Sequence, residues 1–232
     1  VLRRFYTMID YKNKTKVIGF DLDQTLYPKS PEIDEAIQKY IYEKIAASKK
    51  CSLGEARALF ADLYKDGAGM GGSKALATLE IPNGKEIVQE ALERADIASF
   101  LVPNPETINL LKKLKEKYKN LDVITGSNGS ITHRKLKKLD IGKEIFSHII
   151  TKDDASKSDG SAYKIWLSFY DLPPENFLYI GDRVMSDYEV PKNIGVKSIL
   201  VNIKEKNDGV DCPQLSSLLE LGAGFHPDLT GR

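Results

Sequence analysis

The sequence predicts an α/β fold, a doubly wound parallel sheet into which a helical cap is inserted. Two patterns lead to this expectation. Short apolar segments alternate with helix-like segments over the second half of the chain, as in parallel sheets covered by helices on both faces. Between residues 28 and 102, by contrast, only helical periodicity is found. We therefore expect an α/β core of residues 1–27 and 103–232 and a cap of residues 28–102.

The predicted strands are short apolar runs, too short for buried helices. From the second strand on, a helix-like segment separates each strand from the next. A further helix precedes the second strand; it begins at Asn104 and Pro105, with the asparagine as cap. Gly195 ends the last helix of the series. The five predicted strands are Lys16–Phe20, Leu121–Thr125, Ile145–Thr151, Phe177–Gly181 and Ser198–Val201. The later helices are expected around Leu136 and Leu139, from Tyr163 to Phe169 and from Tyr188 to Ile194.

Four helices are expected in the inserted region. An isoleucine stripe from Ile33 to Ile45 marks the first, and Ser52 with Glu55 forms a capping box for the second. Apolar residues around Leu76 and Ala91 mark the other two. Prolines flank both joints with the core, where a hinge would lie: Pro28, Pro31, Pro103 and Pro105.

The composition excludes several functional classes. The chain has 232 residues, 41% of them apolar, and a formal net charge of +1. It can therefore bury an ordinary core, and its charge favours neither nucleic acid nor a membrane surface as partner. It contains no apolar run of the ~20 residues that a membrane span needs. Two isolated cysteines, Cys51 and Cys212, and no secretion-signal pattern predict a cytoplasmic protein.

Charged and polar residues follow the predicted strands. Asp21 and Asp23 come directly after the first strand, and Thr125 and Gly126 end the second. Lys157 follows the third strand, and Asp182 and Asp187 follow the fourth. The carboxyl ends of parallel strands meet at one edge of a sheet, which is where ligands bind in such folds. Four carboxylates at one edge would repel one another, so we expect a cation among them, with the lysine offsetting the remaining charge.

These motifs, in this order, resemble the haloacid dehalogenase-like (HAD) superfamily of phosphohydrolases. The resemblance extends from Lys16 to about Leu221 and rests on Asp-x-Asp-x-Thr, a strand ending in Thr, a Lys and Gly-Asp-x-x-x-x-Asp. It implies that Asp21 is the nucleophile and Asp23 the general acid/base. It further implies phosphate binding by Thr125, Gly126 and Lys157, and Mg²⁺ binding by Asp21, Asp23, Asp182 and Asp187.

The resemblance implies a Mg²⁺-dependent phosphatase that acts on a small phosphorylated metabolite through an aspartyl phosphate. Family dehalogenases lack the second aspartate, since a halide needs no proton, so Asp23 points to phosphate esters. Tyr27 and Pro28, which complete Asp-x-Asp-x-Thr-Leu-Tyr-Pro, look most like the pyrimidine 5′-nucleotidase branch. A nucleoside monophosphate is the substrate that this narrower similarity implies.

Some alternatives remain open at this stage. The enzyme could transfer the phosphoryl group to another alcohol, as sugar phosphate mutases do, or the fold could serve only to bind a ligand. Many relatives have Lys-Pro where this chain has Lys157-Ser158, so Lys152 and Lys164 are further candidates for the phosphate-binding lysine.

Other patterns have less specific interpretations. Asp21, Asp23, Thr25 and Glu32 match the spacing of a calcium-binding loop, but Leu26 stands where that loop requires glycine. Residues 67–72 match a dinucleotide-binding fingerprint, yet no strand precedes them, so a turn between cap helices is expected. His133 and His148 are expected to have structural roles.

Overall fold

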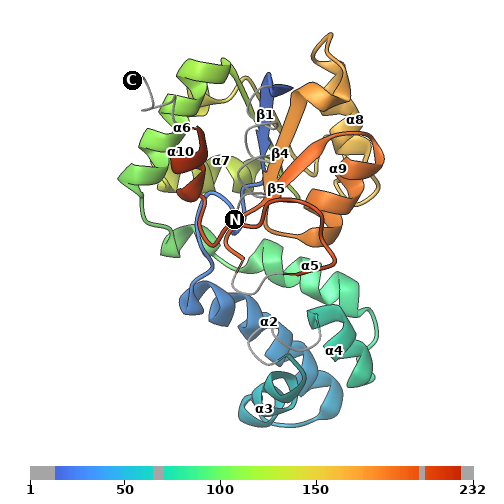
Figure 1. Cartoon of the computed structure of the whole chain (residues 1–232). Coiled ribbons are helices and arrows are strands. Elements are labelled where there is room, and N and C mark those ends of the chain that lie inside the picture. The colour runs from blue at the N-terminus through green and yellow to red at the C-terminus, as the bar shows by residue number, and fades with distance from the viewer. Residues whose placement is uncertain (1–13, 65–70, 204–206, 226–232) are drawn as a thin grey trace. The chain divides into compact units, whose positions relative to one another are not determined.

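The computed structural model describes residues 14–64, 71–203 and 207–225. The chain forms two compact units, one of Val1–Pro28 and Leu101–Arg232 and the other of Lys29–Phe100. All strands of the described residues lie in the first unit, whereas the second is helical (Figure 1).

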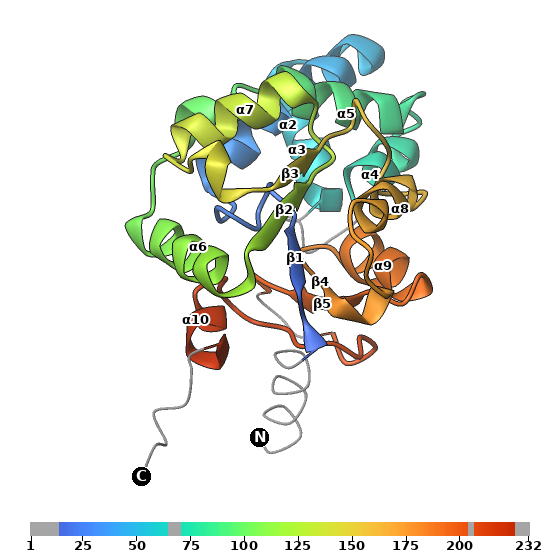
Figure 2. The same ribbon diagram turned by 90° about the horizontal axis from the view of Figure 1, so that it is seen from above.

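The first unit is built on a five-stranded parallel sheet with the strand order β3-β2-β1-β4-β5. Helices α6 and α7 cover one face of the sheet and α8 and α9 the other (Figure 2). This arrangement confirms the predicted doubly wound α/β fold. The strands are β1 (Val17–Phe20), β2 (Asn120–Ile124), β3 (His148–Ile150), β4 (Phe177–Gly181) and β5 (Lys197–Leu200). The helices are α6 (Pro105–Tyr118), α7 (Gly129–Lys138), α8 (Ser161–Ser168), α9 (Val190–Asn193) and α10 (Glu220–Phe225), with short 3₁₀ turns η3 (Lys143–Ile145) and η4 (Pro174–Asn176).

Strand β1 lies at the centre of the sheet, between β2 and β4. Val17 is in register with Asn120 of β2 and with Phe177 of β4. The chain leaves β1 toward β2 on one side, and later returns to β4 on the other side. The strand order therefore reverses at the carboxyl end of β1, the position where open α/β sheets bind their ligands.

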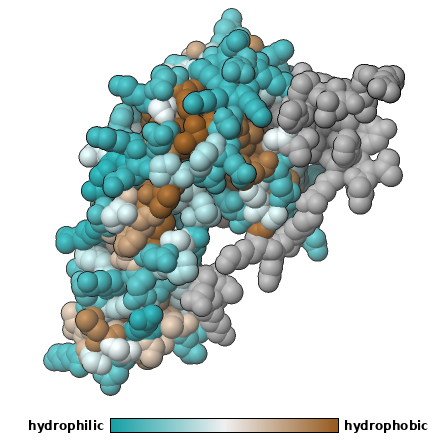
Figure 3. Space-filling view, turned by 90° about the vertical axis from the view of Figure 1, so that its left-hand side faces the viewer, coloured by the Kyte–Doolittle hydropathy of each residue, from teal (hydrophilic) through white to brown (hydrophobic). Residues whose placement is uncertain are grey.

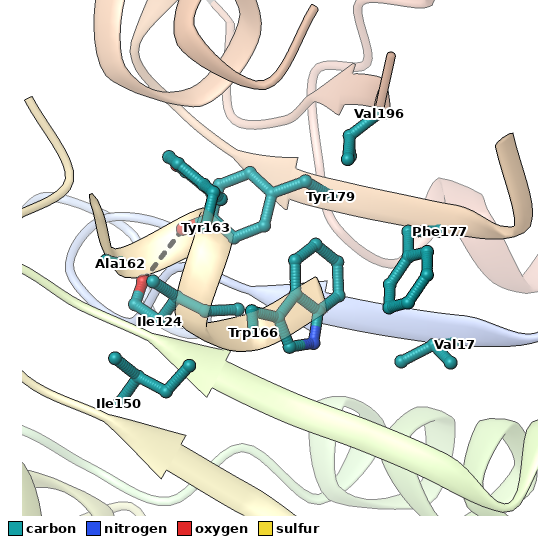
Figure 4. Packing of buried hydrophobic residues seen from close by; sticks show 9 residues of the cluster. All are labelled: Val17, Ile124, Ile150, Ala162, Tyr163, Trp166, Phe177, Tyr179 and Val196. Carbon is teal, nitrogen blue, oxygen red and sulfur yellow. Dashed lines mark hydrogen bonds between the residues drawn. The ribbon is translucent and has the colours of Figure 1, made fainter. Parts of the chain in front are cut away.

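An aromatic cluster fixes α8 against the sheet (Figure 4). The Trp166 indole is fully buried and packs edge-to-face against Phe177, with ring centroids 5.0 Å apart. A Cβ atom at Gly19 of β1 would lie 2.7 Å from this indole and 2.7 Å from Ile124 Cδ1, so only glycine fits at that point of the strand. The Tyr179 hydroxyl donates a hydrogen bond of 2.8 Å to the Ile124 carbonyl.

The helical unit has a core of its own. Its helices are α2 (Pro31–Lys49), α3 (Leu53–Tyr64), α4 (Gly72–Thr78) and α5 (Gly84–Arg94), followed by the 3₁₀ turn η2 (Ile97–Phe100). Ile45, Phe60 and Leu76 are fully buried at its centre. The predicted capping box is present: the Ser52 N–H donates to Glu55 Oε2 (2.9 Å), and the Glu55 N–H donates to Ser52 Oγ (3.2 Å). A helical cap region is thus part of the fold, whereas its action as a lid stays a prediction.

Two elements differ from the sequence-based expectation. The third strand begins at His148, not at Ile145, because residues 143–145 form a 3₁₀ turn. The helix expected from Tyr188 to Ile194 begins only at Val190, because a π-helical segment, η5 (Met185–Glu189), includes its first two residues. Pro191 has no N–H with which to continue regular helical bonding to Asp187, and the wider turn accommodates this.

The surface carries charged side chains with apolar patches between them. The face drawn in Figure 3 is mostly hydrophilic. Large apolar side chains such as Val102 and Met185 are more than two-thirds exposed. Within the part of the chain that the structure describes, no helix combines the length and the apolarity needed to cross a membrane.

Candidate active site

The loop that follows β1 carries both predicted catalytic carboxylates. The Asp21 N–H still donates to the Ile180 carbonyl of β4 (2.8 Å), so this residue lies at the very end of the strand pairing. Leu22 and Leu26 are buried, and the Leu26 N–H donates to the Leu22 carbonyl (3.1 Å), which turns the chain back. The apolar residues of the motif thus anchor the loop, and Asp21 and Asp23 are presented at the carboxyl edge of the sheet.

Three carboxylates from distant parts of the chain meet at this edge. Asp21, Asp182 and Asp187 each contribute an oxygen, and these oxygens all lie within 4.8 Å of one another. Asp187 packs directly against Gly181, where any Cβ atom would collide with its carboxylate. Its oxygens accept hydrogen bonds from the N–H groups of Asp182 (3.1 Å) and Arg183 (3.0 Å). The glycine in Gly-Asp-x-x-x-x-Asp therefore makes room for the last aspartate of the motif.

Lys157 lies between two of these carboxylates. Its Nζ is 2.6 Å from Asp21 Oδ1 and 2.7 Å from Asp187 Oδ1, and only 9% of its side chain is exposed. Both partners are buried as well, so these ion pairs are shielded from solvent. Lys157 is 136 residues from Asp21 and 30 residues from Asp187 along the chain, so these ion pairs join distant segments at one edge of the sheet, as predicted.

The close approach of like charges shifts the acid–base properties of the cluster. Burial, together with the charges of Asp187 and Asp182, raises the pKa of Asp21 to about 7, although Lys157 opposes this shift. Burial and Asp187 likewise raise the pKa of Asp182 to about 6. Burial would raise the pKa of Asp187, but the Lys157 ammonium and the hydrogen bonds from Lys157, the Arg183 N–H and Ser186 together lower it. The cluster holds more negative charge than one lysine can neutralise.

The three carboxylates fit a divalent cation. Asp182 Oδ1 is buried and has no hydrogen-bond partner among the described residues. A buried oxygen without such a partner is available to bind a metal ion. Carboxylate oxygens are the donors that hard cations such as Mg²⁺ prefer. Asp23 is not part of this group of three, so its predicted role as a fourth metal ligand stays a prediction.

The surroundings of Asp23 are different from those of Asp21. Its Oδ1 accepts hydrogen bonds from Lys135 Nζ (2.5 Å) and from the Tyr27 hydroxyl, and its Oδ2 accepts one from Ser127 Oγ (2.8 Å). Burial would raise the pKa of Asp23, but the Lys135 charge and these three donors reverse the effect and lower it. Asp23 is thus held as a carboxylate in a network of donors.

The predicted phosphate-binding turn lies beside Asp23. Thr125 is buried; its N–H donates to the Ile150 carbonyl (2.9 Å), and its Oγ1 accepts from the Ser127 N–H (3.1 Å). Gly126 is exposed, and a side chain there would meet no atom within 4 Å. Asn128 then caps α7 through the Ile131 N–H (2.9 Å). The turn therefore leaves open space at Gly126, next to the carboxylates.

Comparison with known proteins identifies the family. The model of the haloacid dehalogenase-like hydrolases matches residues 18–201, more than three-quarters of the chain. The chain belongs to this family of hydrolases. It is therefore an enzyme, as the motifs predicted.

Individual relatives are distant. A glyceraldehyde 3-phosphate phosphatase from Methanocaldococcus jannaschii is 28% identical over 193 residues, which cover 80% of this chain and 84% of the relative. A HAD phosphatase structure from Thermococcus onnurineus has a TM-score of 0.61 at 22% identity, covering 90% and 97% of the two chains. The structure of Bacillus subtilis YfnB, solved bound to magnesium, has a TM-score of 0.60 at 14% identity, covering 93% and 100%. At these identities the two structures support the fold alone.

The expected similarity to pyrimidine 5′-nucleotidases is corrected by these relatives. A second curated relative, from Pyrococcus abyssi, is also named glyceraldehyde 3-phosphate phosphatase. The residues used for the narrower prediction, Tyr27 and Pro28, follow the catalytic loop directly, and the Tyr27 hydroxyl bonds to Asp23. Such a residue supports the catalytic loop, so it carries little information about the substrate.

Of the three candidate lysines, Lys157 is the one that contacts the acidic cluster, and its role in phosphate binding stays a prediction. Lys152 and Lys164, the alternative candidates, are exposed. The calcium-loop interpretation is not supported, because Asp21 groups with two aspartates from beyond β4. Residues 65–70 lie outside the described residues, so most of the glycine-rich pattern at 67–72 is not observed; α4 begins at Gly72.

Sequence reasoning missed Lys135. It stands in a lysine-rich stretch of α7 that resembles a solvent-facing surface, yet it is only 2% exposed. A usable signal was present: Lys135 is three residues after Thr132 and four before Leu139, on the buried stripe of the helix. A lysine on such a stripe needs a buried partner, and Asp23 is that partner. The two histidines bond to neighbouring groups outside the acidic cluster, His133 to the Gly129 carbonyl and His148 to Asp122.

Proposed function

We propose that this HAD-like hydrolase is a Mg²⁺-dependent phosphatase that hydrolyses a small phosphorylated metabolite through an aspartyl phosphate on Asp21. One observation carries the proposal: two carboxylates two residues apart, at the same sheet edge, stand in opposite environments. Asp21 lies with Lys157 and two further carboxylates, whereas Asp23 is held by three hydrogen-bond donors. Without a metal or substrate these environments favour the protonated form of Asp21 and the ionised form of Asp23. The proposed roles therefore require a bound cation to favour ionised Asp21, and the charge of the substrate phosphate to favour protonated Asp23.

The reaction has two steps. In the first, an Asp21 oxygen attacks phosphorus, the bond to the leaving oxygen breaks, and Asp23 in its protonated form gives that oxygen a proton. In the second, Asp23 takes a proton from a water molecule while the water oxygen attacks the phosphorus. The bond between phosphorus and the Asp21 oxygen then breaks, which releases inorganic phosphate and restores Asp21. The second aspartate thus serves in both steps, and its three donors leave one acceptor site, on Oδ2, for this exchange.

Charge must be neutralised for a carboxylate to approach a phosphate. We propose that Lys157 contacts the phosphoryl oxygens, with Thr125 and the backbone at Gly126, since its Nζ already adjoins Asp21 Oδ1. A magnesium ion held by Asp21, Asp182 and Asp187 would supply further positive charge and orient the phosphate against the nucleophile. The raised pKa values of Asp21 and Asp182 support this role, because a cation among them would favour the ionised form of both groups.

The substrate class follows from the relatives. The curated relatives are named glyceraldehyde 3-phosphate phosphatases, which makes a three-carbon phosphorylated aldehyde the first candidate for this chain. We further propose that the helical unit of residues 29–100 provides selectivity for small substrates, as the inserted caps of similar enzymes do.

A substrate screen tests the proposal. Purified protein with Mg²⁺ is given glyceraldehyde 3-phosphate, other triose and sugar phosphates and nucleoside monophosphates, and released inorganic phosphate is measured, with the Asp21→Asn protein as the blank. We expect release from at least one small phosphate ester and none from the blank. Release that is equal in both proteins would contradict the proposal. If added alcohols became phosphorylated in place of water, the enzyme would be a phosphotransferase.

A further inference from the structure

The second buried lysine of the core unit, Lys135, has no part in the reaction described above. It comes from the second turn of α7, and its side chain is 3% exposed. Burial of an ammonium group is costly unless the group is paired and hydrogen-bonded. Its Nζ has two partners, Asp23 Oδ1 at 2.5 Å and Ser127 Oγ at 3.1 Å. At this buried position of α7 an apolar residue would be usual, but the chain has a lysine whose ammonium group contacts the Asp23 carboxylate.

The contacts of Lys135 form a closed network around Asp23. Ser127 Oγ donates to Asp23 Oδ2 (2.8 Å) and accepts from Lys135, so the two side chains contact both oxygens of the carboxylate. The Tyr27 hydroxyl, four residues after Asp23 in the same loop, donates a further hydrogen bond to Oδ1. The carboxylate is therefore held from three segments, namely the catalytic loop, the turn after β2, and α7.

We propose that Lys135 is a positioning residue, which orients the Asp23 carboxylate for proton transfer to the leaving group. This inference rests on the proposed function. With Oδ1 held by Lys135 and Tyr27 and Oδ2 by Ser127, the orientation of the Asp23 side chain is fixed, and one acceptor site on Oδ2 remains. Lys135 contacts neither Asp21 nor the carboxylates Asp182 and Asp187 in any ion pair of the described residues. It acts through Asp23 alone.

The dependence of kcat/KM on the leaving group distinguishes a positioning role of Lys135 from a purely structural one. An alkyl phosphate releases a strongly basic alkoxide, so its cleavage needs the proton of Asp23. A p-nitrophenyl phosphate releases a stable anion and needs no proton in the same step. Since kcat/KM reports the first irreversible step, loss of orientation at Asp23 should reduce kcat/KM for the alkyl ester and leave that for the aryl ester nearly unchanged.

The experiment compares Lys135→Met with wild type on glycerol phosphate and p-nitrophenyl phosphate. A positioned general acid contributes on the order of 10²- to 10⁴-fold, so we expect about a tenfold or larger fall for the alkyl ester and less than about threefold for the aryl ester. Lys135→Arg, which keeps the charge and the donors, should restore part of the loss. Lys137→Met is the matched control, because Lys137 is exposed on the same helix, and it should alter neither value.

Several outcomes would overturn the inference. Equal losses on both esters would show that Lys135 only supports the fold, and no loss on either would show that Asp23 does not need it. If Lys135→Met fails to fold, Ser127→Ala removes the other donor and must give the same selective loss on the alkyl ester. A wild-type protein that cleaves neither these esters nor any in the screen would refute the proposed function itself, whereas an unchanged ratio of the two esters refutes only the role of Lys135.

Discussion

The two aspartates of the catalytic loop stand two residues apart and have opposite electrostatic environments. Asp21 shares a buried cluster with Asp182 and Asp187, and its pKa rises to about 7 despite the Lys157 ammonium. Asp23 accepts hydrogen bonds from Lys135, Ser127 and Tyr27, and its pKa falls despite its burial. The difference arises from the rest of the fold, because each aspartate meets side chains from different strands and helices. The same residue type can therefore take two chemical roles within one loop.

The largest expected effect is on the nucleophile. Asp21→Asn removes the oxygen anion that attacks phosphorus and should lower kcat by on the order of 10⁴-fold or more. Asp122→Asn is a useful control, since Asp122 is a fully buried carboxylate of the same sheet whose oxygens bond to Trp166 and Tyr170. Steady-state phosphate release measures both variants. If Asp21→Asn retained even a tenth of wild-type turnover, Asp21 could not be the nucleophile.

The second prediction concerns the acidic cluster around Asp21, which is expected to bind a divalent cation that turnover requires. Treatment with EDTA is expected to abolish turnover, and added Mg²⁺ should restore it, because the three carboxylates of the cluster carry more negative charge than Lys157 neutralises. Activity is measured before chelation, after it, and after Mg²⁺ is returned. Full activity in EDTA would contradict the assignment of the acidic cluster to a metal.

A smaller effect is expected from the lysine of the cluster. Lys157→Met removes the ammonium group beside Asp21, and we expect KM for the phosphate ester to rise by about tenfold or more, since phosphate binding loses its nearest cation. The matched control is Lys164→Met, because Lys164 is exposed on α8. An unchanged KM for the first variant together with a raised KM for the second would move the phosphate-binding role to Lys164.

The smallest effects are expected on the stability of the metal-free protein, and they should differ in size between the two sites. Asp23→Asn leaves Lys135 buried without a counter-charge, which should lower the free energy of unfolding by about 1–3 kcal/mol. Asp21→Asn leaves Lys157 paired with Asp187 and relieves repulsion among carboxylates, so we expect a change below about 1 kcal/mol. Urea denaturation in EDTA measures both. A larger loss for Asp21→Asn would show that the two environments are not as different as their contacts indicate.

The sequence predicted the sheet and the acidic cluster well, because both depend on local patterns. Apolar runs ending in Asp21, Thr125 and Gly181 determine where strands end, and parallel strands must bring those ends to one edge. The fourth motif also contained the glycine that gives Asp187 its space. The strand ends and the carboxylates that follow them can therefore be read from the spacing of residues in a single sequence.

What could not be predicted depends on contacts between segments. Lys135 and Asp23 are 112 residues apart, and nothing in the lysine-rich stretch marks one lysine as buried except its register on α7. The π-helical segment before α9 depends likewise on Pro191 and on the fold around Asp187. The narrower substrate prediction rested on Tyr27 and Pro28, and Tyr27 bonds to the catalytic loop, so it carries little information about the substrate.

Identification of the phosphorylated side chain tests the central claim most directly. The wild-type enzyme is quenched in acid during turnover, acyl phosphates are reduced with borohydride, and the labelled peptide is sequenced by mass spectrometry. We predict that the aspartate at position 21 is converted to homoserine and that Asp23 is unmodified. Modification of Asp23, or of a residue outside the acidic cluster, would contradict the account.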